Sequence, residues 1–153
     1  MKIKPFYRRV LYYETDKMAV VHHSNYVRWL EEARIDFLEQ VGFPYDQMEK
    51  DGIISPVLSV SCQYKYAVRF GDTVCIKLKM EDFNGSKYRI SYKVTDKETG
   101  DIRLIAESAH FFVDNDFKPM RVKNASPAIY ELFKSAVGVD LYDDDDDGDN
   151  DNK

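Results

Sequence analysis

The sequence predicts an α+β domain in which a five-stranded antiparallel sheet wraps around one long helix. Two observations lead to this prediction. A segment with a helical hydrophobic period follows a strand-like N-terminal segment, and four strand-like segments then follow one another without a helix between them. This order favours an antiparallel sheet over alternating strand–helix units, which build parallel sheets. At 153 residues the chain is long enough to bury one core.

The long helix is expected over residues 24–41. Its apolar positions are Tyr26, Leu30, Ala33, Phe37 and Val41. Their spacing of four, three, four and four residues is the period of one helix face. Ser24 is the candidate N-cap, and Gly42 followed by Pro44 marks the end of the helix.

The strands are expected at residues 3–13, 57–70, 73–83, 87–96 and 103–113. Asn84-Gly85 is a strong hairpin signal, because a type I′ turn needs a positive φ at both central residues. Gly100-Asp101 gives a weaker signal for the next hairpin. A short helical turn is expected near residues 45–50, and Ser126-Pro127 opens a final helix that reaches about residue 137.

The formal net charge of −5 belongs to the C-terminal end of the chain. Residues 142–153 hold seven aspartates and one lysine, whereas the other 141 residues carry 21 Lys or Arg and 20 Asp or Glu. We therefore expect a near-neutral domain over residues 1–138 and an acidic, disordered tail over residues 139–153. The aspartate run matches the first half of an EF-hand calcium loop, but the later glutamate and the second helix are missing, so a calcium site is rejected.

The composition argues against several classes of protein. Hydrophobic residues make up 44% of the chain and charged residues 32%, as in ordinary globular domains. No apolar run approaches the roughly 20 residues of a membrane span, and the near-neutral domain offers no basic face for duplex nucleic acid. Cys62 and Cys75 lack a metal-ligand or CxxC spacing, which favours two reduced thiols in a cytoplasmic protein.

The segment directly before the long helix, residues 12–26, is the candidate functional site. It brings Asp16, His22 and His23 close to the first turn of that helix. Free backbone N–H groups and the positive end of the helix dipole favour anionic oxygen at such a terminus. A carboxylate a few residues upstream is therefore a candidate for acyl chemistry.

Three segments of the chain resemble hotdog-fold acyl-CoA thioesterases. The first is Y-x-x-T-D-x-M-x-V-V-H-H-x-N-Y followed by R-W-L-E-E-A-R, at residues 12–34. Residues 67–72 are similar to the family's P-A-R-(aromatic)-G-D turn, and residues 117–122 to its closing K/R-P-x-R-(aliphatic) segment. More narrowly, residues 6–137 resemble the 4-hydroxybenzoyl-CoA thioesterase group and the bacterial acyl-CoA thioesterases found beside the Tol–Pal system.

The resemblance implies roles for three residues of the first segment. Asp16 falls on the family's catalytic aspartate, which attacks the thioester carbonyl or activates water. His23 falls on the position whose backbone N–H polarises that carbonyl, and Tyr12 matches a tyrosine near the site. Two positions depart from the family pattern. Ala19 replaces a glycine, which stiffens the loop, and Ala67 replaces the proline of the P-A-R turn.

The remaining candidate residues would bind the substrate. Those expected around the acyl group are Val21, His22, Tyr26 and Trp29. For Trp29 an ordinary place in the helix core stays open, and for His22 a satisfied polar role. Coenzyme A carries phosphates, so Arg69 is a candidate contact, and Ser86 with Lys87 roughly coincides with the place where the 4-hydroxybenzoyl enzyme holds the nucleotide.

The resemblance therefore implies hydrolysis of an acyl-CoA thioester by a homodimer or homotetramer with the hotdog fold. No metal and no cofactor is implied, since coenzyme A is part of the substrate. Two alternatives stay open, which are an acyl-ACP thioesterase and a non-catalytic acyl-CoA-binding module.

Other polar residues receive less specific interpretations. Glu31 or Glu32 would be the next candidate if Asp16 is not the catalytic carboxylate. Their simpler interpretation is a solvated Glu32 and an ion pair from Glu31 to Arg28 or Arg34. His110, in an apolar strand, is expected to be a structural hydrogen-bonding residue.

Overall fold

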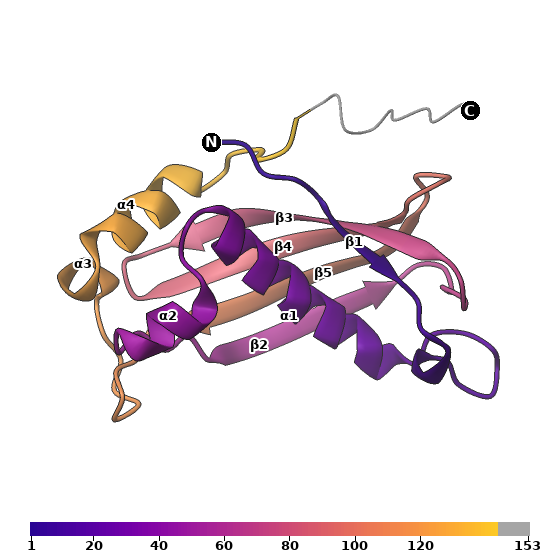
Figure 1. The fold of residues 1–153 in the computed structure, drawn as a ribbon, viewed down its shortest axis with the longest axis horizontal. Coiled ribbons are helices and arrows are strands. Elements are labelled where there is room, and N and C mark those ends of the chain that lie inside the picture. The colour runs from indigo at the N-terminus through magenta and orange to yellow at the C-terminus, as the bar shows by residue number, and fades with distance from the viewer. Residues whose placement is uncertain (144–153) are drawn as a thin grey trace.

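One antiparallel sheet of five strands forms the body of the protein (Figure 1). The computed structural model describes residues 1–143. Across the sheet the order is β1 (Phe6–Arg9), β3 (Thr73–Phe83), β4 (Lys87–Asp96), β5 (Ile102–Phe111) and β2 (Val57–Tyr64). The predicted five-stranded antiparallel sheet is thereby confirmed.

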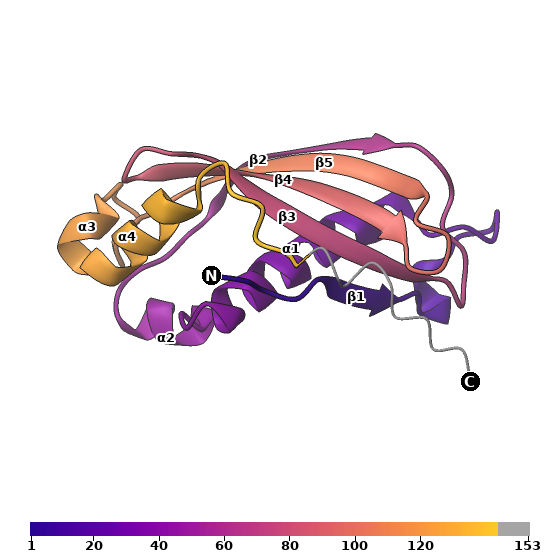
Figure 2. The ribbon, with the colours of Figure 1, turned by 90° about the horizontal axis from the view of Figure 1, so that it is seen from above.

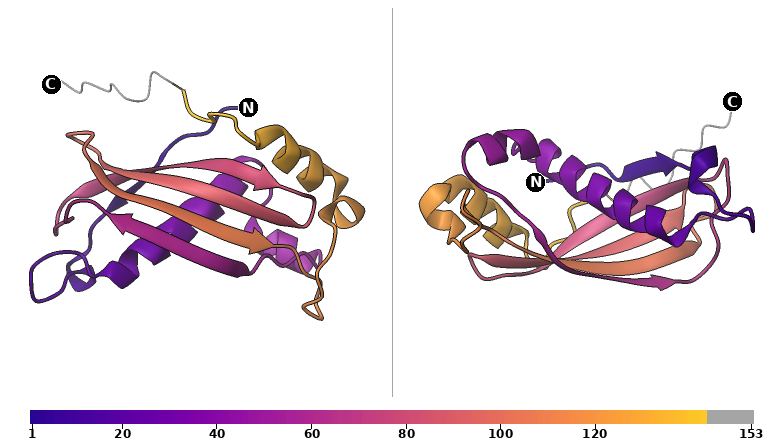
Figure 3. Two further views of the ribbon diagram at one scale, coloured as in Figure 1. Left: turned by 180° about the vertical axis from the view of Figure 1, so that it is seen from behind. Right: turned by 90° about the horizontal axis from the view of Figure 1, so that it is seen from below.

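Helix α1 (His23–Gln40) crosses one face of this sheet at an angle to the strands (Figures 1 and 2). The shorter helices, α2 (Tyr45–Lys50), α3 (Val122–Ala125) and α4 (Pro127–Ala136), lie at one end of the molecule. Seen from behind, the opposite face of the sheet is not covered by any helix of the described residues (Figure 3). The sheet therefore has one buried and one open face, as antiparallel sheets commonly do.

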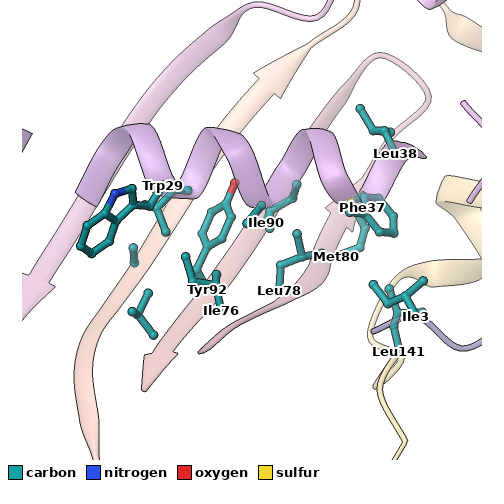
Figure 4. Close-up of a cluster of buried hydrophobic side chains, with 14 of the residues drawn as sticks. Ile3, Trp29, Phe37, Leu38, Ile76, Leu78, Met80, Ile90, Tyr92 and Leu141 are labelled. Atoms are coloured by element: carbon teal, nitrogen blue, oxygen red, sulfur yellow. The ribbon is translucent and has the colours of Figure 1, made fainter. Parts of the chain in front are cut away.

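The core fills the space between α1 and the sheet (Figure 4). Along β4, buried Ile90, Tyr92 and Val94 alternate with less buried side chains, because successive residues of a strand point to opposite faces. From α1, Trp29 and Phe37 pack down onto this surface and are almost inaccessible to solvent. The predicted helical period is confirmed, since all but one of the five predicted positions are buried and Val41 is half-buried.

The first and second predicted strands were too long. β1 ends at Arg9, because residues 12–14 turn into a short 3-10 helix, η1 (Tyr12–Glu14), and β2 ends at Tyr64. After β2 the chain leaves the sheet and covers the loop before α1, where the Val68 carbonyl accepts a hydrogen bond from the Val21 N–H over 2.8 Å. Tertiary contacts of this kind outweigh the strand propensity of an apolar segment.

Ser24 is not the N-cap of α1, and that prediction was wrong. The helix begins at His23, and His22 is the cap, because its Nδ1 accepts the Ser24 N–H over 3.2 Å. The hairpin at Asn84-Gly85 is confirmed, since this turn joins β3 to β4. The predicted type I′ geometry is wrong, because φ is positive at Gly85 (+94°) but not at Asn84. The predicted cap of α4 is confirmed, because the side chain of Ser126 accepts the Ile129 N–H. Helix α3 was not predicted.

The packed chain continues past residue 138. Leu141 and Tyr142 are buried, and the Tyr142 hydroxyl accepts the Leu78 N–H over 2.9 Å. Ile3 forms a bridge with Tyr142, so the two ends of the described chain lie side by side. Most of the predicted disordered tail, residues 144–153, lies outside the described residues.

Candidate active site

A closed loop presents Asp16 beside the start of α1. Thr15 and Val21 form an antiparallel bridge at the base of the loop, and the Asp16 N–H donates to the Val20 carbonyl over 2.8 Å. Ala19 adopts a φ of +62° at its tip. This left-handed conformation suits glycine, which the resembling enzymes have at this position, and costs Ala19 about 1 kcal/mol.

The Asp16 carboxylate borders an open cavity of about 630 Å³. Its Oδ1 accepts the Met18 N–H over 2.8 Å, whereas Oδ2 has no hydrogen-bond partner among residues 1–143. The lining residues are Tyr12, Tyr13, Thr15, Asp16, Lys17, His22, Ser24, Asn25 and Arg28. One carboxylate oxygen is therefore fixed by the loop and the other is available to a ligand or to water.

The N-terminus of α1 forms the adjoining wall. His22 caps the helix and lines the cavity, and the ring of His23 stacks on it with 4.2 Å between the ring centroids. The backbone N–H of His23 has no acceptor within the described part of the chain. Such a free N–H at a helix N-terminus is a donor for anionic oxygen.

A buried ionic group holds this wall in place, and the sequence analysis did not single it out. Glu14 is 3% exposed and pairs with Arg8 through two hydrogen bonds of 3.0 Å. It also accepts the Trp29 Nε1–H and the Leu11 N–H, each over 2.8 Å. Its backbone carbonyl accepts Asn25 Nδ2 over 2.8 Å. In the sequence, this group is marked only by Glu14 standing three residues after Leu11 at a turn. That pattern is too common to predict a buried ion pair.

Three of the expected substrate-binding residues are buried below the cavity. Val21 and Tyr26 are buried, and Trp29 is fully buried in the helix core with its indole N–H donated to Glu14. Burial raises the pKa of Tyr26, and the negative charge of Asp16 adds to the rise, while Arg103 and hydrogen bonding with the Val68 backbone oppose it. None of these three residues lines the Asp16 cavity.

Arg69 lies on the same side of the molecule as Asp16. Its segment contacts the loop through Phe70, whose ring meets the Tyr12 ring edge-on with 5.6 Å between centroids. Ser86 and Lys87 do not lie there. They follow the turn after β3, and β3 starts beside Arg9 and runs about 33 Å to its far end. Within one chain these two residues are at the opposite end of the sheet from Asp16 (Figure 1).

Neither helix carboxylate behaves as predicted. Glu31 is exposed and forms no ion pair among the described residues, because Arg28 donates to Asn25 and Arg34 to Tyr88. The predicted pairing of Glu31 is therefore wrong. Glu32 is only partly solvated, since it accepts Arg8 Nε over 3.0 Å.

A second, smaller cavity of about 110 Å³ lies between α1 and strands β2, β4 and β5. Its polar lining was not predicted as a site. Arg34 follows Leu30 by four residues and therefore falls on the apolar face of α1, and Ser108 and His110 alternate on the buried face of β5. Polar residues at positions where the hydrophobic pattern predicts a buried side chain could have indicated this cavity. His110 shares a 2.7 Å hydrogen bond with Ser108 through Nε2, as predicted, whereas its buried Nδ1 has no partner among residues 1–143.

The fold and the loop–helix site define the class of this protein. Residues 10–133 match the model of the thioesterase-like superfamily, and the chain belongs to that family. Together with the single helix against a five-stranded antiparallel sheet, the match confirms the predicted hotdog fold.

Among known proteins, the chain is 35% identical to YneP of Bacillus subtilis, a proposed acyl-CoA thioesterase, over 83% of this chain and 92% of YneP. The structure of the DHNA-CoA thioesterase of Staphylococcus aureus is similar with a TM-score of 0.82 at 31% identity, covering 86% of this chain and 89% of that one. The structure of a hypothetical protein of Aquifex aeolicus has a TM-score of 0.78 at 32% identity, covering 84% of this chain and 98% of that one.

Two further properties of residues 1–143 bear on the site. No helix there is both long and apolar enough to cross a bilayer. No three His, Cys, Asp or Glu side chains of this region gather in a way that could hold a metal ion.

Proposed function

We propose that this protein is an acyl-CoA thioesterase, which hydrolyses an acyl-CoA to a carboxylic acid and free coenzyme A. The observation that carries the proposal is the free Oδ2 of Asp16 on an open cavity whose wall is a helix N-terminus with a free N–H. Its relationship to YneP and its similarity to the DHNA-CoA thioesterase structure support a thioester substrate.

Asp16 supplies the reacting carboxylate in either of two ways. As a general base it takes a proton from water, and the water oxygen bonds to the thioester carbon. As a nucleophile, its own oxygen bonds to that carbon, coenzyme A leaves, and water hydrolyses the resulting anhydride. In both routes the C–S bond breaks and the thiolate takes up a proton. The Met18 N–H holds Oδ1, so Oδ2 is the oxygen that reacts.

The N-terminus of α1 stabilises the oxyanion. Negative charge develops on the thioester oxygen during attack, and we assign the free N–H of His23 as the donor to it, assisted by the helix dipole. The His22 cap fixes the first turn, and Tyr12 with His22 forms the cavity wall that orients the thioester. Val21 and Tyr26 support this wall from below, and Trp29 holds Glu14 in position.

A second copy of the chain completes the coenzyme A site. β2 is an edge strand with exposed Val57, Leu58, Val60 and Tyr64, which is an unprotected edge that antiparallel pairing with another β2 would cover. A two-fold axis through that pair brings the far end of the partner's sheet beside this chain's Asp16 loop. Ser86 and Lys87 of one copy can then reach the coenzyme A phosphates held near Arg69 of the other.

The assembly is tested by sedimentation at micromolar concentration. Wild type is expected to sediment as a dimer or tetramer, and Val60→Lys on the β2 edge as a monomer, because a charge at the pairing edge blocks strand addition. An active wild-type monomer would rule out the shared site.

Asp16→Asn tests the catalytic proposal. The amide keeps the shape and can still accept from Met18, but it is neither a base nor a nucleophile. We expect normal folding, retained acyl-CoA binding and at least a roughly 10²-fold loss in kcat. Turnover close to wild type on every thioester that the wild type cleaves would reduce Asp16 to a loop residue.

A single turnover in H₂¹⁸O with enzyme in excess separates the two routes. A general base delivers ¹⁸O to the acid at once, whereas a nucleophilic Asp16 delivers one of its own ¹⁶O atoms. Substrate breadth, including acyl-carrier-protein thioesters, is measured on the same wild-type preparation.

A further inference from the structure

Arg34 is a buried charge without a carboxylate partner. It is 3% exposed, and its guanidinium makes a single hydrogen bond within residues 1–143, from Nη1 to the Tyr88 hydroxyl over 3.0 Å. The Tyr45 ring lies against it at 5.5 Å. An arginine has five N–H donors, and most of those of Arg34 have no acceptor within residues 1–143. Donors that border a cavity can bind an anion that enters it.

Arg34 lines the cavity of about 110 Å³ beneath the β2 edge. The other polar lining residues are Arg28, Glu31, Tyr92, Ser108 and His110. The last three are linked by hydrogen bonds of 2.7 Å through Ser108. Figure 4 shows the Tyr92 ring rising from β4 with its oxygen toward α1. Burial lowers the pKa of His110 to about 3, with a further contribution from the Arg34 charge, so His110 is neutral and adds no further cation. Hydroxyl donors, the guanidinium groups of Arg34 and Arg28 and the carboxylate of Glu31 therefore border a space that holds several non-hydrogen atoms, and the charged lining residues sum to +1.

This cavity adjoins the Asp16 cavity. Arg28 lines both of them, and Glu31 lies on the helix turn that follows it. α1 rises about 1.5 Å per residue, so the Arg34 backbone lies about 16 Å along the axis from His23. The guanidinium contacts Tyr88 at the start of β4 and Tyr45 of α2, so it marks the end of the path that is far from Asp16. An extended acyl chain that runs along α1 connects the two.

We propose that the Arg34 cavity receives the far end of the acyl group and selects acyl-CoAs whose acyl chain ends in a carboxylate. This inference rests on the proposed thioesterase activity and adds the substrate class. The guanidinium pairs with the terminal carboxylate, and the Ser108 and Tyr92 hydroxyls complete its hydrogen bonds. The apolar side chains of Val27, Leu30, Val57 and Val60 contact the methylenes before it.

Suberoyl-CoA and octanoyl-CoA, which differ only in the terminal carboxylate, provide the test. For wild type we expect kcat/KM to be at least about tenfold higher with suberoyl-CoA, the range expected for a hydrogen-bonded charge. Arg34→Met keeps the length and removes the charge, so it should reverse this preference while retaining turnover of octanoyl-CoA. Arg89→Met, on the same strand as Tyr92 but on the open face of the sheet, is the matched control and should keep the wild-type ratio.

The outcomes separate the two proposals. If wild type cleaves no thioester, the proposed function fails. If it cleaves both substrates with equal kcat/KM, or prefers octanoyl-CoA, the thioesterase stands and the carboxylate site is overturned. If Arg34→Met folds and keeps the wild-type ratio, the cavity does not bind the acyl terminus, and filling by a second copy is then the alternative. Should Arg34→Met fail to fold, the wild-type ratio alone decides, together with competitive inhibition by free suberate.

Discussion

Two buried charges lie against α1, and they are partnered in opposite ways. Glu14 accepts hydrogen bonds from the Arg8 guanidinium, the Trp29 indole and the Leu11 backbone. Arg34 donates to one tyrosine and forms no ion pair with a carboxylate among residues 1–143. Each is 3% exposed, so burial does not distinguish them. A buried charge whose hydrogen bonds are all made within the chain stabilises the fold. A buried charge that borders a cavity and has free donors is available to a ligand.

The largest expected difference is in stability. Glu14→Ala leaves Arg8 and the Trp29 N–H without their buried acceptor, and we expect a loss of about 3–5 kcal/mol in the free energy of unfolding. Arg34→Met removes a charge that has no ionic partner, so its stability should stay within about 1 kcal/mol of wild type or rise. Urea unfolding of the two variants measures this. Equal losses would remove the distinction between the two charges.

The second effect is pH-dependent and comes from His110. Its folded pKa is lowered to about 3, first by burial and then by the Arg34 charge, against an ordinary value near 6.5. Below pH 6.5 the unfolded chain binds a proton that the folded chain does not, so stability falls with falling pH down to about pH 3. At pH 5 this contribution is about 2 kcal/mol.

His110→Gln provides the control for that effect, because it cannot titrate and its amide can still bond to Ser108. The loss of stability between pH 7 and pH 5 should be about 2 kcal/mol smaller in this variant. An unchanged difference would mean that His110 titrates normally.

A smaller effect on stability is expected at Tyr142, whose buried hydroxyl, like the carboxylate of Glu14, accepts a hydrogen bond from within the chain. Tyr142→Phe leaves the buried Leu78 N–H without an acceptor, which should cost about 1–2 kcal/mol. Thermal unfolding checks this, with a chain that stops after Asp143 as the control. The control should unfold like wild type, because Leu141 and Tyr142 remain.

The smallest effect concerns the loop that separates Glu14 from the helix. Ala19→Gly relieves a positive φ, which favours the folded chain by about 1 kcal/mol, but glycine also gains freedom in the unfolded chain. A net stabilisation of about 0.5 kcal/mol is expected by urea titration, with kcat close to wild type. A marked loss of kcat in Ala19→Gly would show that loop rigidity contributes to turnover.

The sequence by itself determined the antiparallel order of elements, the extent of α1 to within one residue and the turn at Asn84-Gly85. These features depend on hydrophobic period and on local turn chemistry, which are written in neighbouring residues. It also indicated Asp16 beside a helix N-terminus through the motif of residues 12–26. The role of Asp16 in hydrolysis remains a prediction.

Only the tertiary structure decided where β1 and β2 stop and which polar side chains are buried. The strand ends depend on contacts such as Val21 with Val68, which join segments far apart in sequence. Glu14 finds Trp29 across the loop, and Arg34 on α1 lies against Tyr88 on β4. Whether a buried charge is satisfied depends on all the groups that reach it in space. That is why the sequence predicted an ion pair from Glu31 to Arg28 or Arg34, whereas in the folded chain Arg28 donates to Asn25 and Arg34 to Tyr88.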